Sequence, residues 1–232
     1  MNEHTSKKFD AELEGIRTRV LQMGGMVELQ IVKAMEGLAH GDLLLIDQTI
    51  ENDARVNSLE VELDEFCSQI IAKRQPAAVD LRMISTVQKT ITDLERIGDE
   101  AKKIAKTAKQ IHASASPFMP QIRLGHIADA VVDMLRTALD AYARLDTVSA
   151  AQVVRHDKEV DAEFKGIMRQ LITYMIEDPR TISHAIDMMF VAKSVERIGD
   201  HAKNIAEYVV YMVKGRDVRH TSLEEIEREA TR

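Results

Sequence analysis

The pentapeptide Glu-Arg-Ile-Gly-Asp occurs twice in this chain of 232 residues, at positions 95–99 and 196–200. The surrounding windows 94–105 and 195–206 agree at nine of twelve positions and lie 101 residues apart. Chance is a poor explanation for a match of this length, so the sequence predicts a duplicated unit. Any fold for this chain must hold two similar segments in similar surroundings.

Each unit is predicted to be a bundle of three long helices. Apolar residues recur at helical spacing in three runs, a linker at 113–117 follows, and three further runs come after it. The expected helices cover residues 9–38, 46–74, 80–112, 122–145, 148–176 and 180–212. Only 4 Pro and 10 Gly interrupt the chain, which favours helices over strands. The predicted fold class is all-α, with two tandem three-helix bundles at 1–115 and 116–214.

The last segment, 215–232, is charged and poor in apolar residues. Ser222 and Glu225 have the spacing of a helix cap, so a short helix is expected after Ser222. We expect the rest of this segment to be mobile or to face a partner.

Composition excludes several classes of protein. The formal net charge of -7, without a clustered Lys/Arg surface, argues against nucleic-acid binding. Cys67 is the single cysteine, which excludes an internal disulfide and is typical of a core thiol in a reducing compartment. Neither a secretory signal nor an apolar run long enough to span a membrane is visible. We therefore expect a cytoplasmic protein that reaches a membrane only indirectly, through partners.

The repeated pentapeptide places two carboxylates on one helix face, because residues four apart in a helix are neighbours. The preceding helix of each unit carries its own pair at the same spacing. Asp161 and Glu196 lie 18 and 17 residues from Pro179, and Asn57 and Glu95 each lie 19 residues from Pro76. In an antiparallel hairpin these side chains reach matching heights. The eight candidate metal ligands are Asp53, Asn57, Glu95 and Asp99 in the first unit, and Asp157, Asp161, Glu196 and Asp200 in the second.

Converging carboxylates repel one another unless they are protonated, paired with a base or bound to a cation. Oxygen ligands favour Mg, Mn or Ca, and iron is also compatible with carboxylates. Gly98 and Gly199 are costly inside a helix, so a close neighbour or a bound ion is expected there. The second unit is predicted to be the stronger site, because Asp161 and Asn204 replace Asn57 and Lys103, and Lys103 could satisfy acids of the first unit.

The alternative to a metal site is a solvated charged strip. In that interpretation the acids pair with nearby bases of the same helices, which are Arg96, Lys102, Arg197 and Lys203. A third possibility is an enzyme, either a metal-dependent phosphohydrolase or a carboxylate-bridged oxidase. Of the phosphohydrolase signature, only the doublet His156-Asp157 is present. The Glu-x-x-His pairs of carboxylate-bridged oxidases are absent, since His201 follows Glu196 by five residues.

Other signals are weaker. No phosphate-binding loop, dinucleotide fingerprint or nucleophile elbow is present. The remaining histidines are expected at the surface, and the cluster Met188-Met189-Phe190 in the core.

These residues resemble the PhoU family, the regulators of phosphate transport. The resemblance runs through most of the chain and rests on Asn52-Asp53, Arg74-Gln75-Pro76, Asp93 to Asp99, Glu177 to Thr181, and Glu196 to Glu207. It implies two three-helix bundles related by an approximate two-fold, with metal ions or clusters on the acidic pairs. Asn57 departs from the acidic pattern of the family, as does Glu100, which stands where the second unit has His201.

The resemblance also implies a function. It implies a non-enzymatic cytoplasmic adaptor that represses the phosphate-starvation response and restrains phosphate uptake. Its implied partners are the ATPase of the phosphate-specific ABC transporter, a phosphate-sensing histidine kinase and a second copy of the chain. The metal-dependent enzyme and a metal-free structural scaffold remain the competing hypotheses, and elemental analysis of the purified protein would separate the scaffold from the other two.

Overall fold

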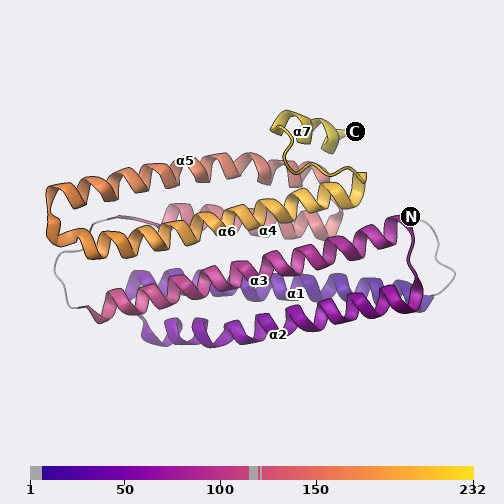
Figure 1. The fold of residues 1–232 in the computed structure, drawn as a ribbon, viewed down its shortest axis with the longest axis horizontal. Coiled ribbons are helices and arrows are strands. Elements are labelled where there is room, and N and C mark those ends of the chain that lie inside the picture. The colour runs from indigo at the N-terminus through magenta and orange to yellow at the C-terminus, as the bar shows by residue number, and fades with distance from the viewer. Residues whose placement is uncertain (1–6, 115–119, 121) are drawn as a thin grey trace.

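The computed structural model describes residues 7–114, 120 and 122–232, and in this part of the chain every regular element is a helix. The elements are α1 (Lys7–His40), α2 (Leu43–Arg74), α3 (Ala78–Ala113), α4 (Gly125–Arg144), α5 (Thr147–Glu177), η1 (Pro179–Thr181), α6 (Ile182–Lys214) and α7 (Leu223–Thr231). The all-α prediction and the plan of three helices followed by three are confirmed (Figure 1).

Equivalent caps begin the second helix of each bundle. The side chain of Asp42 accepts hydrogen bonds from the backbone N–H groups of Leu44 and Leu45, and Asp146 accepts from Val148 and Ser149 in the same way. Each aspartate satisfies backbone donors that the first turn of a helix leaves unpaired. The chain therefore reverses at corresponding places, which keeps the long helices of each bundle antiparallel.

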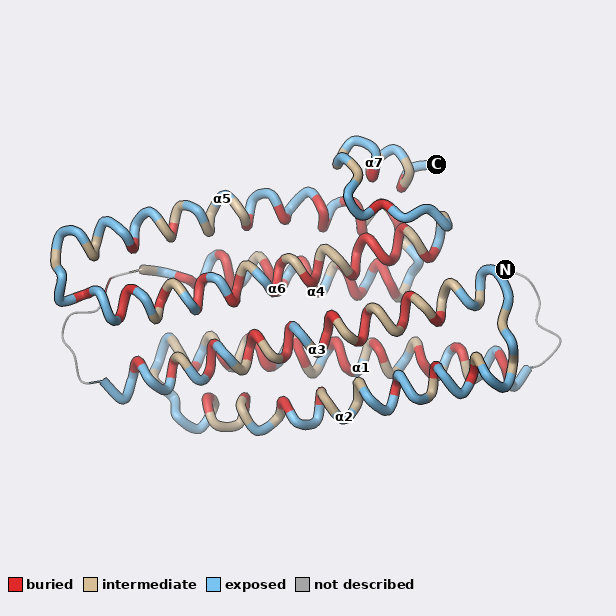
Figure 2. Tube along the Cα trace, in the orientation of Figure 1, coloured by how far each residue is buried: buried red, intermediate tan, exposed pale blue. Residues whose placement is uncertain are grey.

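The two bundles pack mainly through their third helices, with a smaller contact between α1 and α4. α3 contacts α1, α2 and α6, while α6 contacts α4, α5 and α3. In Figure 1 the order from top to bottom is α5, α6, α3 and α2, with α1 and α4 behind. Buried residues form stripes along the faces where helices meet (Figure 2). Because both copies of the repeated pentapeptide lie on α3 and α6, both occupy the middle of the molecule.

Helix boundaries differ from expectation by at most three residues, and the largest differences are at the starts of α2 and α4, with α2 beginning at Leu43 rather than at residue 46. α4 begins at Gly125 rather than at residue 122, after Leu124 in a helical conformation. The predicted linker 113–117 falls mainly outside the described residues, and Ala113 still belongs to α3.

The C-terminal segment differs from the expected mobile or partner-facing tail. The predicted cap is present, since Ser222 Oγ accepts a hydrogen bond from Glu225 N. Ile226 and Ala230 on α7 are only 2% and 3% exposed, because α7 packs against α5. Thr147 Oγ1 donates a buried hydrogen bond of 2.7 Å to the carbonyl of Ala230. The two apolar residues four apart form the buried face by which this helix docks.

Predictions for single side chains had mixed outcomes. Cys67 is buried, as expected for a core thiol, and burial raises its pKa to about 12. Met188 is buried, but Phe190 is 64% exposed, so its placement in the core was wrong. His184 was expected at the surface and is buried, where its Nε2 lies 2.8 Å from Ser114 Oγ. None of the described helices has a window long and apolar enough to cross a bilayer.

Candidate functional site

The acidic residues of the first bundle form a group between α2 and α3, which we call the first acidic group (Asp53, Asn57, Glu95 and Asp99). Asp53 is 2% exposed and accepts a hydrogen bond of 2.6 Å from Lys102 Nζ. The same ammonium lies 3.8 Å from Asp99 Oδ1, and Asn57 Nδ2 donates to Asp53 Oδ2 at 3.4 Å. Side chains from α2 and α3 therefore meet at one height, as the turn counting predicts.

The second acidic group (Asp157, Asp161, Glu196 and Asp200) has the same plan between α5 and α6. Asp157 is 4% exposed and accepts a hydrogen bond of 2.6 Å from Lys203 Nζ. Glu196 is held by Lys193 of its own helix at 2.7 Å. Asp161 makes no hydrogen bond or ion pair within the described residues. The repeat thus preserves a buried aspartate closed by a lysine from the third helix.

The closing base in the first bundle is Lys102, which the charged-strip alternative named, and not Lys103, which was expected to satisfy the acids of this unit. Lys103 pairs with Glu100 at 2.9 Å, and its neighbour Lys102 reaches Asp53. Successive residues in a helix point about 100° apart, so a shift of one position moves the side chain to another face. Asn204 likewise donates to Asp93 Oδ1 at 3.2 Å rather than to the second acidic group.

Both glycines of the repeated pentapeptide are explained by close neighbours. A Cβ at Gly98 would lie 3.2 Å from Gln30 Oε1, and one at Gly199 would lie 3.3 Å from Val131 Cγ1. These contacts bring the first and third helices of each bundle close together, since Gln30 lies on α1 and Val131 on α4. The expected close approach is confirmed, and it accounts for a residue that costs about 1 kcal/mol in a helix.

In each group, burial and neighbouring carboxylates raise the pKa of one acid. Burial, together with Asp99, Glu60 and Asp53, raises the pKa of Glu95 above its usual value. Burial also raises the pKa of Asp200, with Glu196 and Asp157 adding to the effect. Like charges and desolvation both disfavour ionised carboxylates. The acids of each group outnumber the lysines paired with them, which are Lys102 in the first group and Lys193 and Lys203 in the second.

The donor set suits the divalent cation that the sequence resemblance implies, in type and in charge. The oxygens are those that hard cations prefer, and Asp53 Oδ1 and Asn57 Oδ1 are buried without a hydrogen-bond partner. Among residues 7–114, 120 and 122–232, however, no three His, Cys, Asp or Glu side chains surround one position as a metal requires. A cation would therefore require these carboxylates to move from the positions they occupy in the structure.

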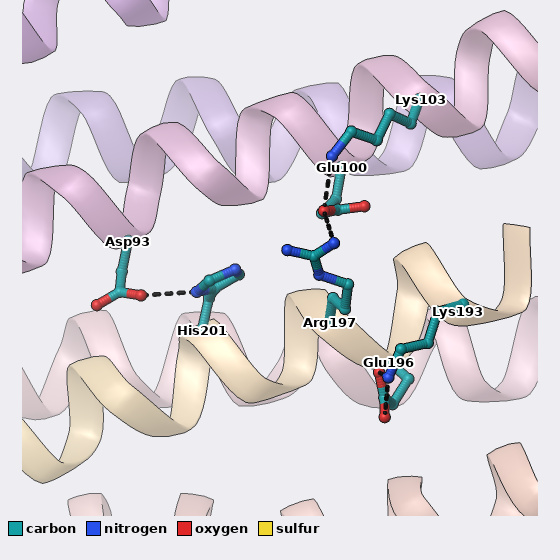
Figure 3. A network of polar contacts seen from close by, with 7 residues as sticks. All are labelled: Asp93, Glu100, Lys103, Lys193, Glu196, Arg197 and His201. Atoms are coloured by element: carbon teal, nitrogen blue, oxygen red, sulfur yellow. Dashed lines mark hydrogen bonds and ion pairs between the residues drawn. The ribbon is translucent and has the colours of Figure 1, made fainter. Parts of the chain in front are cut away.

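A second polar cluster joins the two bundles, and sequence analysis missed it. His201 Nδ1 on α6 lies 2.6 Å from Asp93 Oδ1 on α3, and both side chains are less than a tenth exposed (Figure 3). Arg197 reaches across the same interface to Glu100 at 3.2 Å (Figure 3). The only signal in the sequence was the departure from the repeat, where Glu100 stands in place of His201.

Comparison with known proteins agrees with the division of the chain into two similar bundles. The family model described as the PhoU domain matches residues 20–108 and 124–209, one match in each bundle. The phosphate-specific transport system accessory protein PhoU of Escherichia coli K12 is 46% identical, over 98% of this chain and 94% of that protein. The Pseudomonas aeruginosa protein named as a homolog of this accessory protein is 45% identical to the present chain, over 99% of this chain and 95% of that protein.

Solved structures show the same fold. The crystal structure of PhoU from Pseudomonas aeruginosa has a TM-score of 0.86 and 46% identity, covering 90% of this chain and all of that chain. The phosphate transport system regulatory protein PhoU from Streptococcus pneumoniae has a TM-score of 0.81 and 25% identity, covering 90% of this chain and 99% of that chain. Sequence and structure agree over both bundles, and the chain belongs to the PhoU family.

Proposed function

We propose that this protein is a cytoplasmic, non-enzymatic adaptor that represses the phosphate-starvation response and restrains phosphate uptake. The observation that carries the proposal is its similarity, across both bundles, to proteins named as accessory or regulatory proteins of phosphate transport. The proposed partners are the ATPase of a phosphate-specific ABC transporter and a phosphate-sensing histidine kinase. A homodimer is the proposed assembly.

The proposed adaptor binds divalent cations through its two acidic groups. The ligands would be Asp53, Asn57, Glu95 and Asp99 in one bundle, and Asp157, Asp161, Glu196 and Asp200 in the other, with Mg, Mn or Fe as the ion. A bound cation would supply positive charge that partner carboxylates could share. The chain's own residues bury one aspartate in each group and hold it with a lysine, at 2.6 Å in both cases.

The surface near the turn between α5 and α6 supports a role in docking. Large apolar side chains stand exposed there, including Ile176 at 77% and Phe190 at 64%. Exposed apolar residues that cluster on a surface are typical of protein interaction sites. We assign this surface to contact with a protein partner.

A gene deletion tests the regulatory role. Cells that lack the gene should express alkaline phosphatase at a high level in phosphate-rich medium, and the wild-type gene should restore repression. The variant Glu196→Gln plus Asp200→Asn should restore it poorly if the second acidic group acts in regulation. Asp129→Asn plus Asp133→Asn on α4 is the matched control, because it removes two exposed acids at the same spacing. Normal repression in the deletion strain would refute the proposed function.

A further inference from the structure

A cavity of about 350 Å³ lies between α5, α6 and the segment that leads into α7. Its apolar wall consists of Val154 on α5 together with Leu223 and Ile226 on α7, the helix that lies beside α5 in Figure 1. Val154 and Ile226 are buried, so the packing of α7 against α5 fixes this wall. The volume is that of a site for a small organic molecule, which in proteins measures about 300–1,000 Å³.

One polar end of the cavity is the carboxyl group of Glu207 on α6. Glu207 is only 7% exposed, and in the described part of the chain it forms no hydrogen bond or ion pair. The bases Lys203 and Arg219 also line the cavity, but Asp157 holds the first at 2.6 Å and Asp217 holds the second at 2.6 Å. A buried carboxyl group without a partner is unusual, because the loss of hydration is not compensated.

The protonation of Glu207 widens the set of groups that it can bind. Burial raises the pKa of Glu207 to about 7, against the opposing effect of Lys203. Near neutral pH the carboxyl group is therefore present in both forms. The neutral form accepts a hydrogen bond through one oxygen and donates one through the other. It thus fits a ligand edge that presents a donor beside an acceptor.

The other polar end is Lys158 on α5. This side chain is exposed and makes no hydrogen bond or ion pair with any residue that the structure describes. The charged side chains that line the cavity are three bases and two acids, namely Lys158, Lys203, Arg219, Asp157 and Glu207. The lining is therefore net positive, although the chain has a formal net charge of -7. An anionic group is favoured here, and Lys158 is the base that is free to bind it.

The distance between the two ends follows from the contact of Asp157 with Lys203, which sets the register of α5 against α6. Glu207 lies four residues beyond Lys203, and Lys158 lies one residue beyond Asp157. Because the two helices are antiparallel, these steps run in opposite directions. At a rise of about 1.5 Å per residue, and with allowance for the long lysine side chain, the two backbone positions are roughly 7–10 Å apart along the helix axes.

Both ends are departures from the internal repeat. Lys106 stands in the first unit where the second has Glu207, and Ala54 follows Asp53 where Lys158 follows Asp157. Within residues 7–114, moreover, no short helix packs on α2 as α7 packs on α5. The duplicated plan does not explain the cavity, and it occurs in the second bundle alone.

We propose that this cavity binds a nucleotide, with the base between Glu207 and the apolar wall and the phosphate at Lys158. An adenine base presents an amino donor beside a ring nitrogen acceptor, which is the edge that a carboxyl group can pair with. Its flat face packs against Val154 and Ile226, and the ribose spans the distance to Lys158. This inference goes beyond the proposed function and involves no cation. Because α7 supplies part of the wall, the bound nucleotide stabilises the docked position of α7.

Isothermal titration of the full chain with AMP tests the proposal. AMP should bind at one site per chain. Adenosine lacks the phosphate and ribose 5-phosphate lacks the base, so each should bind at least about tenfold more weakly. Purine riboside 5′-monophosphate lacks only the amino group and tests the contact with Glu207. It should bind about tenfold more weakly than AMP, because one donor to the carboxyl group is missing.

Two variants assign the ends of the ligand. Lys158→Gln should weaken AMP binding about tenfold and leave adenosine binding unchanged, since only AMP carries the phosphate. Lys165→Gln is the matched control, because it removes an exposed lysine of the same helix that lies outside the cavity, and it should change AMP affinity by less than about twofold. Glu207→Leu should weaken binding of AMP but not of purine riboside 5′-monophosphate. Urea unfolding of each variant detects a loss of structure, and the comparison of ligands requires no variant.

Hydrogen exchange locates the ligand independently. AMP should slow exchange in α7, whose residues Leu223 and Ile226 line the cavity. Exchange in α7 that AMP leaves unchanged would place the ligand elsewhere and overturn the proposal. A chain that does not bind AMP at millimolar concentration would also overturn it, as would equal affinity for AMP and purine riboside 5′-monophosphate, or AMP binding that Lys158→Gln leaves unchanged. None of these results bears on repression or on cation binding, so this inference and the proposed function fail separately.

Discussion

The contact between Asp93 and His201 joins the two bundles, and its removal should destabilise the whole protein. His201→Ala deletes a hydrogen bond of 2.6 Å to a carboxylate whose side chain is 4% exposed. A hydrogen bond to a charged group contributes about 1.5–3 kcal/mol, and an uncompensated buried charge costs about 3–5 kcal/mol. Asn204 still donates to the same oxygen at 3.2 Å, which offsets part of the loss. We expect the free energy of unfolding to fall by about 2–3 kcal/mol.

Urea unfolding, followed by far-ultraviolet circular dichroism, measures this loss. With a slope of about 2–3 kcal/mol per molar urea, the midpoint should fall by roughly 1 M. Glu14→Ala is the reference, because it removes only an exposed ion pair within one helix, with Arg17 at 3.1 Å. A midpoint shift below about 0.2 M for His201→Ala would show that the contact does not hold the bundles together.

Three further predictions concern packing, protonation and the C-terminal helix. Gly37→Ala places a Cβ 2.6 Å from Ile46 Cγ1, whereas Gly25→Ala meets nothing within 4 Å, so the first variant should be less stable than the second by about 1–3 kcal/mol in urea unfolding. Glu207 has a raised pKa of about 7 when folded, so its stabilising contribution is complete below the unfolded pKa and is lost as pH rises through 7. Glu207→Gln should therefore reduce the fall in stability between pH 5 and pH 8 by about 1–3 kcal/mol. Thr147→Val removes the bond to Ala230 and should speed hydrogen exchange in α7, with a local loss of about 1 kcal/mol.

Each of these predictions has an outcome that contradicts it. Equal stability of the two glycine variants would mean that Ile46 yields to the added methyl at no cost. An unchanged pH profile for Glu207→Gln would show that this carboxyl group ionises in the folded protein as it does in the unfolded chain. Exchange in α7 that is unaffected by Thr147→Val would show that the bond to Ala230 does not hold this helix in place.

The helices and the acidic groups could be predicted because both depend on local regularities. Helical periodicity and the proline turns set the length of each hairpin, and counting from Pro76 and Pro179 places Asp53 and Asp157 opposite the third helix. Because the unit is duplicated, the same counting could be made in both bundles and gave the same arrangement of acids in each. Burial of both aspartates, at 2% and 4% exposure, follows from their place on the apolar faces of their helices.

Features that depend on the arrangement of whole helices could not be predicted. Asp93 and His201 are 108 residues apart on different bundles, and no local pattern sets how the bundles pack. The choice of Lys102 over Lys103 depends on the rotation of α3 about its axis. Phe190 belongs to an apolar cluster in sequence, yet it points outward because the faces of α6 that meet other helices are already filled by neighbours such as Met188.

Crystals of the protein loaded with Mn²⁺, with anomalous difference maps recorded, give the most direct test of cation binding by the acidic groups. We predict an anomalous peak at Asp157, Glu196 and Asp200, with Lys203 Nζ moved out of hydrogen-bond range of Asp157. A map without a peak at either acidic group, with Lys203 still bound to Asp157 at 2.6 Å, would contradict the account.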